Sequence, residues 1–123
     1  MVSEIEVARL QESRPGAQVL RRPDRTAIVV VPGVALPAGW SHQHTCVRWL
    51  LSPAYPAAQP DCFYTDLDLR ISGGATPTNT GVQQLDAQPL LWFSWHLQVA
   101  WRPGRDDLLT YLRFVESRFA DVR

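Results

Sequence analysis

The chain has 123 residues, of which 46% are hydrophobic and 20% are charged, and its 12 basic and 12 acidic side chains give a formal net charge of zero. This length and composition predict one globular domain over residues 1–123, with enough apolar side chains for a buried core. A neutral chain lacks the basic surface that nucleic acid requires, and no apolar run is long enough to cross a bilayer, so we expect neither nucleic acid nor a membrane as a partner.

The first ten residues carry Glu4 and Glu6 and show no basic segment followed by an apolar one. No secretory signal is visible, so the cytoplasm is the expected location. Cys46 and Cys62 then stay reduced, and their strand-like surroundings predict two buried thiols. All 12 basic residues are arginine. The absence of lysine has two explanations, a codon preference or the avoidance of side-chain amines near a reactive thioester, and the sequence does not separate them.

The N-terminal half reads as a helix followed by strands. Ser3 and Glu6 fit a capping box, which predicts a short helix ending near Ser13. Apolar and β-branched runs separated by turn-forming residues then predict strands at 19–20, 27–31 and 45–51. Residues 22–25 are predicted to form a turn, and Pro32-Gly33 is predicted to break the chain.

A proline-rich connection and another strand follow. Residues 52–60 contain three prolines, which exclude both a helix and a central strand and predict a stiff, extended connection. In residues 63–71, Leu67, Leu69 and Ile71 alternate with polar side chains. This alternation predicts a strand with one buried face.

The C-terminal part ends in the clearest helix of the chain. Residues 72–81 read as a loop, and residues 88–101 are apolar and aromatic without a clean period. From Asp106 to about Ala120, one apolar stripe recurs at spacings of four, three and four, formed by Leu108, Leu112, Val115 and Phe119. Arg118 suits the last turn of this helix, where a cation stabilises the helix dipole. The order of the elements predicts an α+β domain: a helix, about four antiparallel strands, an irregular stretch and a final helix.

Several motifs occur in an order that is typical of one family. Tyr55-Pro56 with Pro60, between two strands, resembles the Tyr-Pro-x-x-Pro-Pro connection of ubiquitin-conjugating enzymes and RWD domains, and Trp101-x-Pro103 resembles their Trp-Ser-Pro. The ordered set also includes Leu36-Pro37-Ala38-Gly39, His42, Pro60-Asp61-x-Phe63-Tyr64-Thr65-Asp66, Ser72-Gly73-Gly74 and Ser94-Trp95-His96. On these residues, the chain is similar to prokaryotic ubiquitin-conjugating (UBC-like) proteins of the family E type over roughly residues 27–120.

The resemblance implies a UBC-like fold, no cofactor, and two partners: a ubiquitin-like protein, single or multi-domain, and an activating-enzyme homologue. A conjugating enzyme carries its cargo on a cysteine thiolate, which follows a His-Pro-Asn motif in the family. From Phe63 to Arg123 there is no cysteine, and the single asparagine, Asn79, lies in the predicted loop. The sequence therefore departs from the active pattern at both positions, which favours a protein that is not an enzyme but leaves that question open.

Three residues are weak catalytic candidates. Cys62 is expected to face or flank the core, where a thiol is a poor nucleophile. Ser94 lies near the family's nucleophile position, and His96 would share its face of a strand as a possible base. The competing interpretation is that His96 only orders the local structure through hydrogen bonds.

His42, His44 and Cys46 also alternate, and together with Cys62 they make a conceivable zinc set. The competing interpretation is a solvated strand entrance followed by a core thiol. We favour that interpretation, so the sequence predicts no metal site.

The aromatic residues near the irregular stretch are expected to be mostly core, with some exposed as a binding surface. The candidates for that surface are Trp92, Phe93 and Trp95. Three functions stay open: a non-catalytic module that binds a ubiquitin-like protein or its activating enzyme, a divergent conjugating enzyme with a displaced nucleophile, and an RWD-like interaction domain. The first is favoured.

Overall fold

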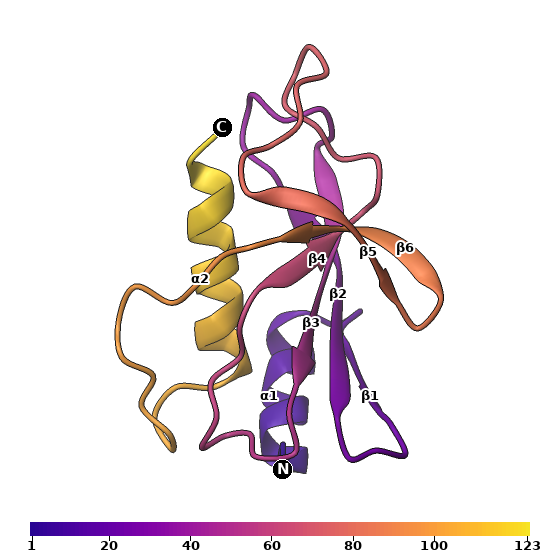
Figure 1. The fold of residues 1–123 in the computed structure, drawn as a ribbon. Coiled ribbons are helices and arrows are strands. Elements are labelled where there is room, and N and C mark those ends of the chain that lie inside the picture. The colour runs from indigo at the N-terminus through magenta and orange to yellow at the C-terminus, as the bar shows by residue number, and fades with distance from the viewer.

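A six-stranded antiparallel sheet carries two helices on one face (Figure 1). The computed structural model describes residues 1–123. Its elements are α1 (Glu4–Ser13), β1 (Gln18–Arg21), β2 (Ala27–Ala35), β3 (His44–Leu51), β4 (Phe63–Thr65), β5 (Thr80–Leu85), β6 (Gln88–Phe93) and α2 (Leu108–Ala120). The strand order is β1-β2-β3-β4-β6-β5. The predicted α+β class is confirmed, the arrangement is consistent with a UBC-like fold, and the sheet has two strands more than the four expected.

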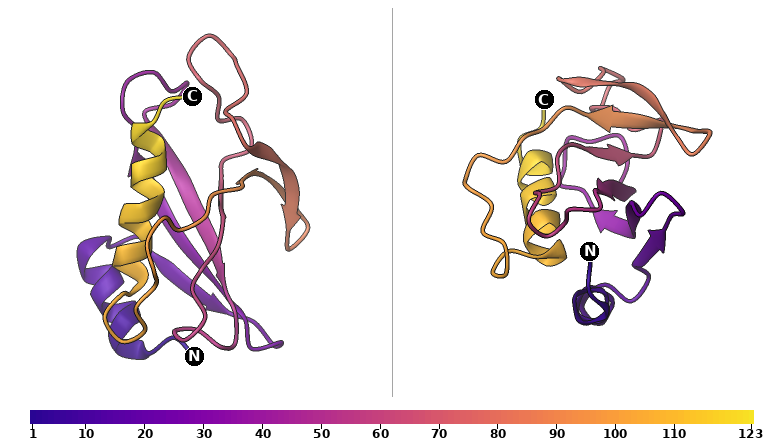
Figure 2. Two further views of the ribbon diagram at one scale, coloured as in Figure 1. Left: turned by 60° about the vertical axis from the view of Figure 1, so that its left-hand side comes forward. Right: turned by 60° about the horizontal axis from the view of Figure 1, so that its bottom comes forward.

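The core lies between the sheet and the helices, which Figure 2 (left) shows on the same side of the sheet. Alternate side chains of β2 and β3 point into it, namely Val29, Val31, Val47 and Trp49. The predicted stripe of α2 is buried against them, as Leu108, Leu112, Val115 and Phe119. Each such side chain stabilises the fold by about 1.5–3 kcal/mol. Neither helix is both long and apolar enough to cross a membrane.

The opposite face of the sheet has a smaller apolar cluster, made of Ile28, Tyr64, Leu85 and Leu90. Two of these residues come from the β5–β6 hairpin, which twists away from the rest of the sheet (Figure 1). The loop predicted over 72–81 ends at residue 79, where β5 begins, and the stretch predicted to be irregular over 88–101 is wrong for residues 88–93, which pair with β5 as a strand. The hairpin turns at Asp86 and Ala87, which both have positive φ, +48° and +65°.

Two further predictions for the strands need correction. Residues 63–71 do not form one strand, because β4 ends at Thr65. The carboxylate of Asp66 there accepts hydrogen bonds from Thr45 Oγ1 (3.0 Å) and from the backbone N–H of Cys46 (3.2 Å), which replaces strand pairing by side-chain contacts with β3. Pro32-Gly33 does not end its strand either, since β2 continues to Ala35 through an irregularity in register.

Both helices begin with a side-chain cap. Ser3 Oγ accepts the backbone N–H of Glu6 at 3.1 Å, as predicted, but the Glu6 carboxylate accepts the Tyr55 hydroxyl (2.5 Å) instead of completing the box. In α2, Asp107 and Thr110 cap each other at 3.0 Å in both directions. The α2 cap stabilises the start of this helix, directly after the irregular residues 94–107.

Arg118 does not lie at the helix surface. Its side chain is 1% exposed, and its guanidinium lies over the rings of Trp40, Phe93 and Trp95. It donates to the backbone carbonyls of Thr78 (3.1 Å), Asp121 (2.7 Å) and Arg123 (2.8 Å). This buried cation therefore ties the end of the chain and the loop before β5 to the core.

Candidate functional site

The segment of residues 94–107, which we call the connecting segment, joins β6 to α2 without helix or strand of its own. Trp101 anchors it: the indole Nε1 donates to the carbonyl of Pro56 at 2.8 Å, and its ring lies 6.0 Å from that of Tyr55. Tyr55 is fully buried. The fold therefore brings together the Tyr-Pro and Trp-x-Pro motifs, which are more than 40 residues apart in the sequence.

Next to the start of this segment, three side chains with different chemistry converge. One donor atom from each of Asp61, Cys62 and His96 lies within 4.8 Å of the other two. His96 Nδ1 is 2.6 Å from Asp61 Oδ1, and both side chains are largely exposed, whereas Cys62 is only 9% exposed. Cys62 and His96 were separate candidates from the sequence and Asp61 was not a candidate, although Asp61 and His96 both belong to the ordered motifs.

The backbone of Cys62 is held from two sides. Its φ is +61°, a left-handed conformation that is unfavourable for any residue with a Cβ. Its N–H donates to the carbonyl of Trp95 (3.1 Å), and its carbonyl accepts the hydroxyl of Tyr111 (2.7 Å). The connecting segment and α2 thus fix the position from which the thiol projects.

Both thiols are poorly suited to nucleophilic attack. Burial raises the pKa of the Cys62 thiol, a hydrogen bond from the backbone of Trp95 to the sulfur offsets part of this, and the negative charge of Asp61 raises the pKa further. Burial likewise raises the pKa of Cys46. Because the thiolate is the nucleophile, both cysteines are weak nucleophiles near neutral pH.

The pairing of Ser94 with His96 is not present. β6 ends at Phe93, so the two-residue alternation that would align their side chains does not continue. The N–H of Ser94 donates to the carbonyl of Asn79 at 2.8 Å, and no hydrogen bond joins Ser94 to His96. Ser94 therefore has no base to activate it, and the imidazole is committed to Asp61.

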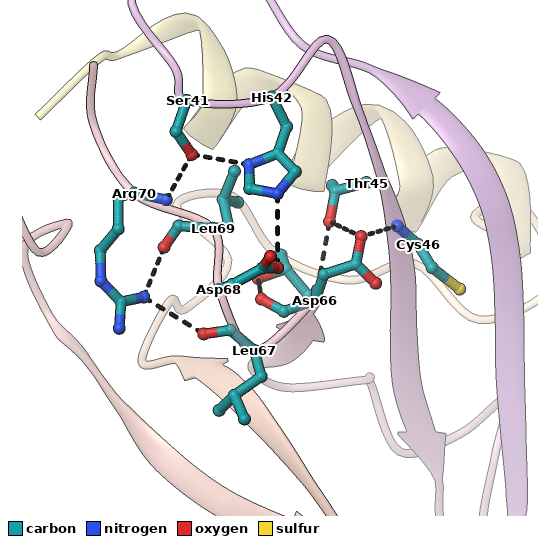
Figure 3. A network of polar contacts seen from close by, with 10 residues as sticks. Ser41, His42, Thr45, Cys46, Asp66, Leu67, Asp68, Leu69 and Arg70 are labelled. Atoms are coloured by element: carbon teal, nitrogen blue, oxygen red, sulfur yellow. Dashed lines mark hydrogen bonds and ion pairs between the residues drawn. The ribbon is translucent and has the colours of Figure 1, made fainter. Parts of the chain in front are cut away.

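His42 belongs to a separate polar network, at the loop that precedes β3 (Figure 3). Its Nδ1 lies 2.6 Å from Ser41 Oγ and its Nε2 lies 3.3 Å from Asp68 Oδ1. Ser41 Oγ also accepts the backbone N–H of Arg70 at 2.8 Å. These contacts join residues 41–42 to the turn after β4.

The zinc set considered from the sequence is not assembled. The Cys46 backbone is held by Asp66, and Cys62 lies instead beside Asp61 and His96. His44 begins β3 and is exposed. The alternation of His42, His44 and Cys46 therefore did not predict which side chains come together, since those that meet come from segments 35 residues apart.

The three aromatic candidates for a binding surface have different environments. Phe93 is buried, with its ring stacked 4.7 Å from that of Phe63, so it belongs to the core and not to a surface. Trp92 is half-buried on the face of the sheet that carries the smaller cluster. Trp95 is half-buried too: its ring lies 5.9 Å from that of Phe114, and its Nε1 is buried without a hydrogen-bond partner.

A groove of about 590 Å³ separates the connecting segment from α2. Its lining residues are Leu97, Val99, Ala100, Trp101, Arg102, Asp106, Thr110, Arg113 and Phe114. Val99 is 74% exposed, and Pro103 pairs with Asp106 in an isolated bridge that closes the far end of the segment. Five of the nine lining residues are hydrophobic, and Arg102 and Arg113 are the basic ones among them.

Comparison with known protein families gives a match. The model of the family described as prokaryotic E2 family E matches residues 17–121, which is most of the chain. No curated protein and no solved structure gives a significant match.

Proposed function

The chain belongs to prokaryotic E2 family E, and from this membership we propose that it is a non-catalytic E2-like module of a ubiquitin-like protein system. In this proposal it binds a ubiquitin-like protein, its activating enzyme, or both, and forms no thioester. We assign this role to the cytoplasm, where both thiols stay reduced.

One observation carries the proposal: no exposed thiol is available where the family mechanism needs one. The connecting segment contains no cysteine. The thiol beside it, Cys62, is 9% exposed, and both backbone groups of this residue are engaged. A thioester at Cys62 would require the C-terminus of the cargo to reach a sulfur atom that is shielded by the fold.

The groove beside the connecting segment supports the binding half of the proposal. It combines exposed apolar side chains such as Val99 with the cations of Arg102 and Arg113. Interfaces with other proteins commonly combine an apolar centre with arginines.

The test measures binding and covalent attachment separately. The purified chain is tested by biolayer interferometry against the cognate ubiquitin-like protein and the activating enzyme, and all three are then incubated with ATP and run on a non-reducing gel. We expect binding to at least one partner and no reducible adduct. A Val99→Asp variant should weaken the binding, whereas Val82→Asp, on the exposed hairpin, should leave it unchanged.

A second candidate function is a conjugating enzyme that uses Cys62. The observation in its favour is the contact of Asp61 with His96 beside the thiol, since a carboxylate can orient an imidazole as a base. A reducible adduct that is lost in Cys62→Ser and kept in Cys46→Ser would establish this function and overturn the first. Failure to bind either partner would favour the RWD-like alternative.

A further inference from the structure

The convergence of Asp61, Cys62 and His96 offers three kinds of metal ligand in one place. A carboxylate oxygen, a thiol sulfur and an imidazole nitrogen lie within 4.8 Å of one another. No arginine pairs with Asp61, whose ion-pair partner is His96. When His96 is neutral, as an imidazole that binds a metal is, the cluster therefore has no cation of its own to balance a carboxylate and a thiolate.

We propose that Asp61, Cys62 and His96 form a binding site for a divalent transition-metal ion of the zinc type, with water as the fourth ligand. A set of one sulfur, one nitrogen and one oxygen suits Zn²⁺ or Co²⁺ better than Mg²⁺ or Ca²⁺, which prefer oxygen ligands. On binding, the Cys62 thiol releases its proton to solvent. The carboxylate and the thiolate then balance the two charges of the ion.

The distances fit this site after small movements. With Zn–S near 2.3 Å and Zn–N or Zn–O near 2.0–2.2 Å, ligand atoms of a tetrahedral site lie roughly 3.3–3.7 Å apart. The donor atoms lie within 4.8 Å of one another, so a shift of about 1 Å assembles the site. The 2.6 Å contact from His96 to Asp61 is shorter than two ligands of one ion allow, so it opens when the ion enters. Both side chains are exposed and free to rotate.

The backbone conformation of Cys62 also supports this site. A left-handed conformation at a residue with a Cβ persists only where its surroundings enforce it, and such residues gather at functional sites. Here the carbonyl of Trp95 and the hydroxyl of Tyr111 enforce it, at 3.1 and 2.7 Å. Cys62 is thus held in place before the ion binds, and the exposed side chains of Asp61 and His96 move to complete the site.

The test uses the full chain alone, so its result is independent of the proposed binding function. Co²⁺ is titrated into the metal-free protein and the thiolate-to-cobalt charge-transfer band is recorded, and Zn²⁺ affinity is then measured by competition with a chromophoric chelator. We expect a band that saturates at one equivalent and is displaced by Zn²⁺. Cys62→Ser should abolish the band, and His96→Gln and Asp61→Asn should each weaken Zn²⁺ binding about tenfold or more.

Matched controls use the other thiol and another histidine. Cys46→Ser and His44→Gln should bind as the native chain does. Circular dichroism checks that each variant is folded, and His96→Gln, on an exposed side chain, keeps the test valid if Cys62→Ser unfolds. Absence of the band, its loss in Cys46→Ser, or Zn²⁺ affinity that is unchanged in His96→Gln overturns the proposal.

Discussion

Replacing Arg118 with methionine is expected to lower the free energy of unfolding by about 3 kcal/mol, because methionine fills similar space but cannot donate hydrogen bonds. The side chain is 1% exposed and donates to three backbone carbonyls, those of Thr78, Asp121 and Arg123. No Asp or Glu side chain forms an ion pair with it, although the charge of Asp121 lies near enough to act on its pKa. Burial accordingly lowers the pKa of the guanidinium, which the nearby cation of Arg123 lowers further.

The magnitude follows from three contributions. Hydrogen bonds from a charged donor are worth about 1.5–3 kcal/mol each, but the three acceptor carbonyls belong to exposed residues and regain part of this from water. Contacts of the cation with three aromatic rings, at 5.3–5.8 Å, add about 0.5–1 kcal/mol each. Against these losses, methionine avoids the desolvation cost of a buried charge, which is several kcal/mol.

Urea unfolding followed by tryptophan fluorescence measures the effect, since the chain has five tryptophans. With a slope of about 1–3 kcal/mol per molar urea, the midpoint should fall by about 1–3 M. The urea midpoint of Arg118→Lys should lie between those of the native chain and Arg118→Met, because a single ammonium cannot reach three carbonyls. Arg113→Met, on the exposed face of the same helix, should change stability by less than about 0.5 kcal/mol. An unchanged midpoint in Arg118→Met, or an equal loss in Arg113→Met, would refute the reasoning.

Three further outcomes are expected. Gly39→Ala should cost about 2–3 kcal/mol in thermal unfolding, because φ is +106° and the new Cβ would lie 2.8 Å from a methyl carbon of Val122. Stability should fall as the pH drops below about 4, because a backbone N–H at 2.7 Å holds the pKa of the Asp106 carboxyl below its usual range. This contribution is present above the unfolded-state pKa and is lost as the pH falls through the lower folded-state value. Iodoacetamide should label both thiols slowly at neutral pH and rapidly after unfolding, because burial raises their pKa.

Each expectation has a comparison that could contradict it. Gly73→Ala, with φ +94° but open space around the new Cβ, should cost less than Gly39→Ala, and an equal cost would exclude the clash as the cause. Asp106→Asn should flatten the fall in stability at acid pH, and an unaltered profile would assign it to other carboxyls. Peptide mass spectrometry should find Cys46 labelled before the less exposed Cys62, and the reverse order would show that the Cys62 thiol is reactive.

Sequence patterns identified the helices and strands in which the hydrophobic residues follow the burial of the element. The stripe of α2 was readable because burial repeats with the helical period, and β2 and β3 were readable because they are rich in β-branched and apolar residues. The β5–β6 hairpin was not readable. Its turn is Asp86-Ala87, without the glycine that marks such turns, and β5 carries exposed glutamines on a poorly covered strand.

For the candidate site too, some features follow from the sequence and others only from the tertiary structure. The sequence alone determined the family resemblance and the absence of a cysteine after Cys62, since both depend only on which residues are present. The tertiary structure decided that Asp61, Cys62 and His96 meet, that Phe93 is core, and that Arg118 is buried beneath aromatic rings. The physical reason is that these outcomes depend on contacts between segments far apart in the chain. Periodicity reports which face of an element is buried, but not what lies opposite it.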